Sequence, residues 1–543
     1  MDSLPPISRR RMLHGLMAGG AAVTLPGLWS LARAQVPIAS GRDPETLVVA
    51  TEAAVDNLDP ATNIDWAMGL VPVYETLTVL KGTSTTEVGP SLASSWTKNA
   101  DASRWTFEIA AGATFHDGTA CDAAAVKAAI LRTLTLGSGN GYVWGIADGE
   151  TQIIVEDASH ITFDLGAPRA FFDVQVSGQY GFWIASAAAA EANSTGPDDQ
   201  GSAWLQRNPV GTGPYRLVSL EPGQQAVYEA DPGYRGGWKP GQFKKIVIRA
   251  VPVESSRLQM LDSGEADVIF PLPPEETIAL RDAGRFKVSD SETLTMNFIA
   301  LGCYGPLADP RARQAMNHAF DAVSYRDQIQ LGLKAPAHGC FPVGLSGANP
   351  DQGVPGFDLA KAQELFAAAG VAPGTELTYL YYEGIGKQAG ELLQALLGSV
   401  GITLSLVEKS YSAFAGDYFG DAPPDQRYNM YAFSWWPNFN HPTEYARPLF
   451  HSASAGSMGG NAGFYRNDEV DRILDETQDA AIDAALLEKM KRLQEIVAVE
   501  DPAWIPIFQD RTAMPYRTDI AGMDLNPAYA LTLPFYGMTR GGA

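Results

Sequence analysis

The sequence predicts an α/β protein with more than one lobe, and three observations support this class. At 543 residues the chain is too long to fold around a single hydrophobic core. Its second half alternates strand and helix patterns, as where "ELTYLYY" is followed by a helical stretch and then by "ITLSLVE". The chain has no fixed-period repeat and no low-complexity linker, so we expect the lobes to exchange strands through more than one crossover.

The first half of the chain is dominated by strand and turn patterns. A short apolar strand begins at Thr46 and runs into a loop that is closed by Asp59-Pro60. Trp105, Phe107 and Ile109 alternate as in a half-buried strand, and Asp122 is placed to cap the helix that follows. We expect pairs of strands with tight turns at 151–165 and 208–230, a strand at 243–252, a helix at 254–264 and a strand at 265–270.

The second half carries the clearest helical patterns. In "DPRARQAMNHAFDA", residues 309–322, a proline occupies the first turn and the apolar side chains recur at helical spacing. Further helices are predicted at 358–370, 387–400 and 483–500, and strands at 376–382, 402–408 and 503–510.

The N-terminal residues form an export signal rather than part of the fold. Residues 8–13, "SRRRML", supply paired arginines, a weakly apolar stretch follows, and Ala32-Arg33-Ala34 offers a small-x-small cleavage site. Residues 1–34 resemble a twin-arginine signal peptide, whose pathway carries folded proteins into the periplasm. The alternative is a single membrane anchor, but the stretch is short and glycine-rich for a span of about 20 apolar residues.

Composition and charge restrict the possible partners. The hydrophobic content of 45% and the charged content of 19% are typical of a soluble globular protein. The net charge of −23 repels phosphate backbones, so we expect no nucleic-acid binding. Among the three cysteines, Cys303 and Cys340 are possible disulfide partners, whereas Cys121 is expected to pack as a small apolar side chain.

The sequence gives no sign of catalysis. It lacks the patterns G-x-S-x-G, H-E-x-x-H, C-x-x-C and G-x-x-x-x-G-K-[ST], and its seven histidines are scattered. "GTGPY" at 211–215 begins like a dinucleotide-binding loop, but it lacks the third glycine and is followed by no helix. We therefore expect no enzymatic activity, no cofactor and no metal site built from protein ligands.

The segment "FSWWPNFNHPTEYARPLF", residues 433–450, is the most unusual stretch of the chain. Adjacent side chains of a strand point to opposite faces, so Trp435 and Trp436 cannot both enter one core. Either a second domain covers one of them or one faces a cavity. We expect one tryptophan to pack in the core and the other to offer a stacking surface for a sugar, an aromatic ring or a cationic group.

Several motifs, in order and at matching spacing from about Thr46 to Phe508, resemble the peptide/nickel type of extracellular solute-binding protein that serves ATP-binding-cassette importers. They are "LDP" at 58–60, "VYETLTVL" at 73–80, "PSLASSW" at 90–96, "FHDGT" at 115–119, "NPVGTGPYRL" at 208–217, "LDSGEADV" at 261–268, "PLADPRARQAMNHAFD" at 306–321 and "VGI" at 400–402.

The resemblance implies a two-lobed periplasmic-binding-protein clamp, type II-like, with an extra subdomain in the first lobe. Residues 46–80, 208–285 and 513–543 would form lobe I, 81–207 the extra subdomain and 286–512 lobe II. A small-molecule solute would be held between the lobes, and closure would present the protein to an ABC permease in the inner membrane. The mature chain is expected to be a periplasmic monomer that does not insert into the membrane.

The resemblance also implies candidate ligand contacts. Peptide-binding members carry an aspartate for the ligand's α-ammonium a few residues after a tryptophan, and here Asn438 takes that place, next to Phe439. An amide carries no charge to offset the desolvation of an ammonium, so free-amino peptides are disfavoured unless Glu52, Glu383 or Glu444 takes over. Lys387 lies near a position where some members bind the ligand carboxylate; the alternative is an exposed helix-terminal lysine.

Two aromatic residues of the extra subdomain, Tyr142 and Trp144, are candidates for the opposite wall of the cleft, with packing in that subdomain's own core as the alternative. The leading function is a receptor for a peptide-like, N-blocked or glycosylated solute. The alternatives are a metal–chelate receptor using His441 or His451, a secreted hydrolase using paired carboxylates, and a chaperone-like or structural protein.

Overall fold

The computed structural model describes residues 38–63, 66–136, 140–382, 386–456, 459–529 and 531–541. The predicted signal peptide, residues 1–34, lies outside the described residues. In the described part of the chain, no helix has the length and apolar character that a membrane span requires.

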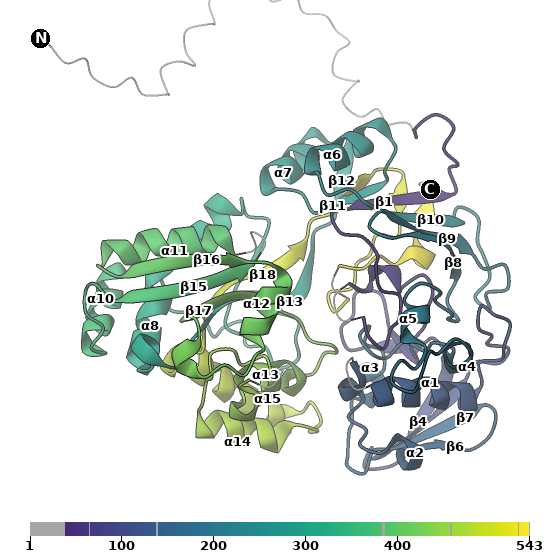
Figure 1. The fold of residues 1–543 in the computed structure, drawn as a ribbon, viewed down its shortest axis with the longest axis horizontal. Helices are drawn as coiled ribbons and strands as arrows, with labels where there is room; N and C mark the ends of the chain where they lie inside the picture. Colours follow the sequence, from purple (N-terminus) through teal and green to yellow (C-terminus); the bar gives the residue numbers. More distant parts are fainter. Residues whose placement is uncertain are drawn as a thin grey trace, which may run out of the picture.

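A seven-stranded sheet organises the body that we call the first lobe, at the top and right of Figure 1. Its order is β12-β19-β11-β1-β10-β9-β8, and the central strand β1 runs parallel to β10 and β11. The strands are β1 (Thr46–Thr51), β8 (Tyr215–Glu221), β9 (Gln225–Ala230), β10 (Lys245–Ala250), β11 (Val268–Phe270), β12 (Phe286–Val288) and β19 (Pro515–Arg517).

Both faces of this sheet are covered, which explains why β1 is apolar along its length. Leu47 and Val49 enter one hydrophobic cluster, whereas Val48 and Ala50 enter another beneath the helices. These opposite destinations follow from the two-residue period of a strand. The helices are α6 (Glu254–Ser263) and α7 (Pro274–Ala283).

A four-stranded antiparallel sheet, in the order β4-β5-β7-β6, forms the body that we call the extra subdomain, at the lower right of Figure 1. Trp105, Phe107 and Ile109 are buried on one face of β5, and Asp122 caps α1 by accepting a bond from Ala125 N, as predicted. Its elements are β4 (Ala93–Lys98), β5 (Arg104–Ile109), α1 (Ala123–Leu136), α2 (Gly149–Gln152), β6 (Ile153–Val155), β7 (His160–Asp164), α3 (Phe172–Gln175), α4 (Ala187–Ala192) and α5 (Ser202–Leu205). A separate hairpin, β2 (Thr78–Leu80) and β3 (Val88–Pro90), precedes them.

A mixed six-stranded sheet, in the order β14-β18-β13-β17-β15-β16, forms the second lobe, at the left of Figure 1. Its strands are β13 (Ser291–Leu301), β14 (Ala335–Pro336), β15 (Glu376–Tyr382), β16 (Thr403–Lys409), β17 (Met430–Trp435) and β18 (Trp504–Thr512). Its helices are α8 (Pro310–Ala319), α9 (Ala322–Ser324), α10 (Leu359–Ala368), α11 (Lys387–Ser399), α12 (Tyr411–Tyr418), α13 (Pro442–Phe450), α14 (Asp468–Thr477) and α15 (Ala484–Glu495). The predicted β15–α11–β16 unit is confirmed, with β15 and β16 parallel.

The two lobes are joined by two crossovers that lie side by side. One links β12 to β13 through residues 289–290, and the other links β18 to β19 through residues 513–514. Ser289 N donates to Met514 O at 3.0 Å, and Met514 N donates to Ser289 Oγ at 2.9 Å. The predicted boundary between residues 285 and 286 is therefore too early, because β12 still pairs with β19 of the first lobe. Two short crossovers tied to each other form a natural hinge.

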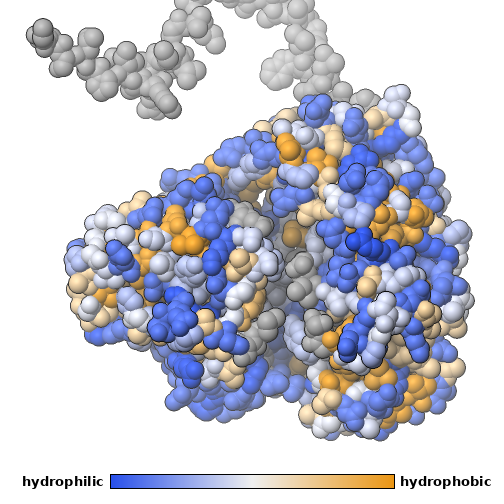
Figure 2. All heavy atoms as spheres, viewed as in Figure 1, coloured by the Kyte–Doolittle hydropathy of each residue, from blue (hydrophilic) through white to orange (hydrophobic). Residues whose placement is uncertain are grey.

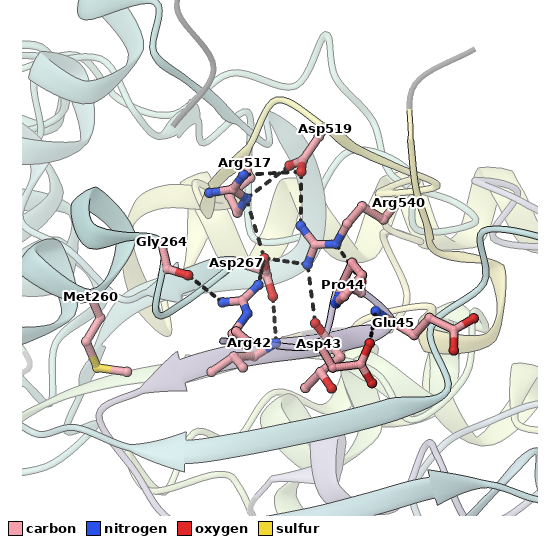
Figure 3. Close-up of polar contacts among 12 residues, drawn as sticks. Arg42, Asp43, Pro44, Glu45, Met260, Gly264, Asp267, Arg517, Asp519 and Arg540 are labelled. Carbon is pink, nitrogen blue, oxygen red and sulfur yellow. Dashed lines mark hydrogen bonds and ion pairs between the residues drawn. The ribbon is translucent and has the colours of Figure 1, made fainter. Parts of the chain in front are cut away.

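A buried ionic network fastens both ends of the described chain to the first lobe (Figure 3). Asp267, which is fully buried, accepts from Arg42 Nη2 at 2.5 Å and from Arg540 Nη2 at 2.7 Å. Arg517 lies 3.5 Å from the same carboxylate, and Asp519 bonds to both Arg517 and Arg540. The final strands β20 (Ile520–Ala521) and β21 (Thr539–Arg540) pair in this region.

The three cysteines are free in this structure. Cys340 is fully buried in the second lobe, and burial raises the pKa values of the Cys121 and Cys303 thiols, to about 12 and about 11. A disulfide between Cys303 and Cys340 is therefore not formed.

Candidate ligand-binding site

The two tryptophans lie at the end of β17 and at the start of the connection to α13, residues 436–441, and they pack against different lobes. Trp435 packs with the second-lobe cluster, 6.3 Å from Phe433 between ring centroids. Trp436 instead packs against the first-lobe cluster, 6.4 Å from Tyr180. The prediction that they cannot share a core is confirmed, and a second lobe covers Trp436. Both rings remain half-buried.

The same connection crosses to the extra subdomain. The Phe439 side chain is 8% exposed and joins the subdomain's hydrophobic cluster, with its ring 5.7 Å from Phe171. His441 stacks on Phe171 at 4.0 Å, and burial lowers the pKa of its imidazole to about 4. Asn440 Nδ2 donates to Thr85 Oγ1 at 2.7 Å, at the tip of the β2–β3 hairpin. Through these contacts the second lobe packs against the extra subdomain and the β2–β3 hairpin. Figure 2 shows a hollow between the two sides of the molecule.

A cavity of about 360 Å³ lies at this crossing. Four of the predicted ligand contacts line it, namely Trp435, Asn438, Phe439 and Tyr142. Its other charged or polar lining side chains are Arg169, Gln175, His441, Thr443, Glu444, Arg447, Ser454, Gln478 and Asp479. It thus combines second-lobe residues with residues of the extra subdomain, at a volume suited to part of a small ligand.

Asn438 is held by Glu444, which lies in the first turn of α13. Asn438 Nδ2 donates to Glu444 Oε1 at 2.9 Å, and Asn438 N donates to the same carboxyl group at 3.2–3.3 Å. Burial raises the pKa of Glu444 to about 8, because desolvation outweighs the hydrogen bonds that favour its charge. Near neutral pH this carboxyl group is therefore largely protonated.

The two arginines of the cavity are paired with acids. Arg169 Nε lies 3.3 Å from Asp479, and Arg447 Nη2 lies 2.9 Å from Asp475. Among the described residues, no three His, Cys, Asp or Glu side chains come together in a group that could hold a metal ion. His451, the other histidine of the metal–chelate alternative, bonds to Asp475 and to the backbone N–H of Ala453.

Comparison with known proteins identifies the family. A family model for bacterial extracellular solute-binding proteins, family 5 (middle part), matches residues 87–457, more than half of the chain. The chain belongs to this family. Family 5 proteins are solute-binding components that serve ABC permeases, so the chain is a periplasmic binding protein and not an enzyme.

Individual relatives are similar to this chain over nearly its whole length. The chain is 28% identical to the probable D,D-dipeptide-binding periplasmic protein DdpA of Escherichia coli K12, over 90% of this chain and 94% of DdpA. It is 26% identical to the E. coli K12 glutathione-binding protein GsiB, over 95% and 97% of the two chains. The structure of Helicobacter pylori DppA in complex with the peptide STSA has the same fold, with a TM-score of 0.78 at 22% identity over 92% and 98%. The predicted two-lobed clamp is thereby confirmed.

The other predicted contacts that the structure of this family 5 protein describes, Trp436 among them, do not line the cavity. Trp144 is 1% exposed and stacks on Phe163 at 6.0 Å, so the prediction that it lines the cleft is wrong. Its ring packs in the core of the extra subdomain, which was the alternative prediction for this residue. Glu52, after β1, and Lys387, at the start of α11, are exposed, and neither lines this cavity. Glu383 lies outside the described residues.

Several residues of the cavity were not predicted. Arg447 follows Glu444 by three residues on α13, so the helical period places both on one face, and this signal was available in "EYARPLF". Arg169 and Gln175 come from the extra subdomain, far from segment 433–450 along the chain. Only the tertiary fold brings them there.

A larger cavity, of about 730 Å³, lies between the first lobe of the family 5 protein and residues 82–183, and it has no lining residue from 286–512. Glu75 and Arg235 line this cavity and neutralise each other. Both carboxylate oxygens of Glu75 accept hydrogen bonds from Arg235, at 2.5 and 2.6 Å. A clamp of this kind holds its solute between the lobes, and of these two cavities only the smaller one is lined by residues from both sides.

Proposed function

We propose that this periplasmic binding protein captures a small peptide-like solute whose amino end is blocked, by an acyl group or a sugar, and delivers it to an ABC permease. The observation that carries the proposal is the Asn438–Glu444 pair, in which an amide and a largely protonated carboxyl group stand where peptide-binding relatives are expected to offer an aspartate. Enclosing an ammonium here would cost several kcal/mol without an opposing charge.

The Asn438–Glu444 pair also favours an uncharged group of the solute as its partner. The amide nitrogen of Asn438 already donates to Glu444 and reaches Tyr142 Oη at 3.5 Å. Among the described residues no donor reaches Oδ1 of Asn438, which leaves this oxygen to accept the N–H of an acylated amine or the hydroxyl of a sugar. The half-buried Trp435 lines the same cavity and supplies an aromatic face there.

The substitution Asn438→Asp tests this proposal. We expect affinity for free-amino dipeptides such as alanyl-alanine to rise about 10- to 100-fold, because a charge-assisted bond to the ammonium is gained. Isothermal titration calorimetry of both proteins with alanyl-alanine and N-acetyl-alanyl-alanine measures the change. Asn193→Asp, which adds the same charge at an exposed site on the subdomain, is the control. Tight binding of free-amino dipeptides by the wild type would contradict the proposal.

Export through the twin-arginine pathway is part of the same proposal. Because that pathway reads the arginine pair as an address, the double substitution Arg9→Lys and Arg10→Lys is expected to leave the full-length precursor in the cytoplasm. Cell fractionation and immunoblotting show this, with Arg11→Lys as the control. Undiminished periplasmic protein from the double variant would point to another route.

A further inference from the structure

The loop of the second lobe that carries Asn438, residues 436–441, packs along residues 171–182 of the extra subdomain. The distances between ring centroids are 6.4 Å for Trp436 and Tyr180, 5.7 Å for Phe439 and Phe171, 6.4 Å for Phe439 and Phe182, and 4.0 Å for His441 and Phe171. We call these two segments together the interlobe seam. Because the seam joins residues on opposite sides of the hinge, opening of the clamp would separate them.

Gly178 lies within the interlobe seam, directly against the backbone of Asn438. A Cβ atom at position 178 would lie 2.7 Å from the carbonyl oxygen of Asn438 and 2.9 Å from Cδ2 of Phe182. Both distances are well below van der Waals contact, so a methyl group fits here only if a neighbour moves. The backbone of Gly178 is not in the left-handed region. Glycine is therefore needed at this position for the close approach and not for its conformation.

The neighbours of this contact have little room to move. In the second lobe, Phe439 is 8% exposed within the subdomain's hydrophobic cluster, and Asn440 is 1% exposed and donates to Thr85. In the subdomain, Phe182 is fully buried in the same cluster. A side chain at position 178 would therefore displace Asn438 or loosen the fit between the lobes, because its bulk cannot be absorbed locally.

Asn438 is thus held at two points. Its carbonyl oxygen lies against Gly178, and its side-chain nitrogen donates to Glu444 Oε1 at 2.9 Å. Gly178 itself does not line the cavity of about 360 Å³, whereas Asn438 does. An effect of position 178 on the solute must therefore pass through Asn438 or through the closure of the lobes.

We infer that Gly178 is a positioning residue of the binding site. It lets the backbone of Asn438 settle against the extra subdomain as the clamp closes, and it thereby places the Asn438 side chain toward the solute. A larger residue would hold the loop and the subdomain apart and lose this preorganisation. The inference deepens the proposed function and rests on it, because it takes the blocked amino end of the solute to lie at Asn438.

A double-mutant cycle tests this role, with alanyl-alanine as the probe in isothermal titration calorimetry. In the otherwise unchanged protein, Asn438→Asp is expected to raise the affinity about 10- to 100-fold, because a charge-assisted bond to the ammonium is gained. In the Gly178→Ala background we expect this gain to fall below about 3-fold, because the new carboxylate no longer meets the ammonium. A purely structural role of Gly178 would weaken binding with and without Asn438→Asp alike and would leave the gain unchanged.

Gly196→Ala is the matched control. Gly196 lies in the same subdomain and also outside the left-handed region, and a Cβ atom there meets no atom within 4 Å. We expect Asn438→Asp to keep its gain of about 10- to 100-fold in this background. Circular dichroism and thermal unfolding show whether Gly178→Ala folds. If it does not, Gly178→Ala is combined with Phe182→Leu, whose shorter side chain makes room inside the subdomain but not at the Asn438 carbonyl, and Phe182→Leu alone is the reference.

The outcomes separate this inference from the proposed function. An equal gain from Asn438→Asp with and without Gly178→Ala would overturn the positioning role and leave the blocked-amine solute standing. A gain that Gly196→Ala removes as fully as Gly178→Ala would also overturn that role. No gain from Asn438→Asp in the otherwise unchanged protein would instead defeat the proposed function, and the inference would fall with it.

Discussion

Asp267→Asn is expected to lower the free energy of unfolding by about 3–5 kcal/mol, because it leaves Arg42 without a carboxylate partner and leaves Arg517 and Arg540 to share the single carboxylate of Asp519. The Asp267 carboxylate accepts from Arg42 and Arg540, lies 3.5 Å from Arg517 and also accepts from the backbone N–H of Val48 at 2.8 Å. The Arg517 and Arg540 side chains are 2% and 10% exposed, so water cannot replace the lost charge efficiently.

Urea unfolding at pH 7 measures this change. Asp262→Asn provides the matched control, because Asp262 pairs with Arg285 at 3.1 Å on the surface, where both side chains are about half exposed. We expect this control to change stability by less than about 1 kcal/mol. Equal effects of the two substitutions would show that the network in Figure 3 does not fasten the chain ends.

Much of the fold was predictable because local patterns decide it. The alternation of Trp105, Phe107 and Ile109 and the β15–α11–β16 unit required only the periods of strand and helix. The position of the crossover was not predictable in this way. β12 belongs to the first lobe because of its pairing with β19, whose residues lie far away in the sequence.

The candidate site was predictable only in part. The opposed tryptophans and the amide at position 438 follow from residue types within one short segment. The environment of Trp144 depends on packing against Phe163 and Phe182, which no local pattern reveals. The presence of Arg447 and Gln175 in the lining of one cavity likewise depends on how the second lobe packs against the subdomain.

The substitution Glu444→Gln is expected to stabilise the protein at neutral pH, because glutamine has no charge to lose on burial. Folding raises the pKa of Glu444 from its ordinary value of 4.5 to about 8, mainly through desolvation. Between these two values the folded protein holds a proton that the unfolded chain releases, so the wild type loses stability as pH rises from 4.5 to 8. Glutamine resembles the protonated acid and can still accept the bonds from Asn438.

The stability difference between Glu444→Gln and the wild type should therefore follow pH in a defined way. We expect it to be near zero at pH 4.5, to grow above that value and to level off above pH 8, reaching about 2 kcal/mol because the side chain is only half-buried. Urea unfolding at a series of pH values gives the profile, and Glu364→Gln, at an exposed site on α10, should give a flat one. A variant that is less stable than the wild type at pH 7 would mean that Glu444 is charged in the folded protein. A charged Glu444 would supply the anion that Asn438 lacks, and free-amino peptides would then become the favoured solutes.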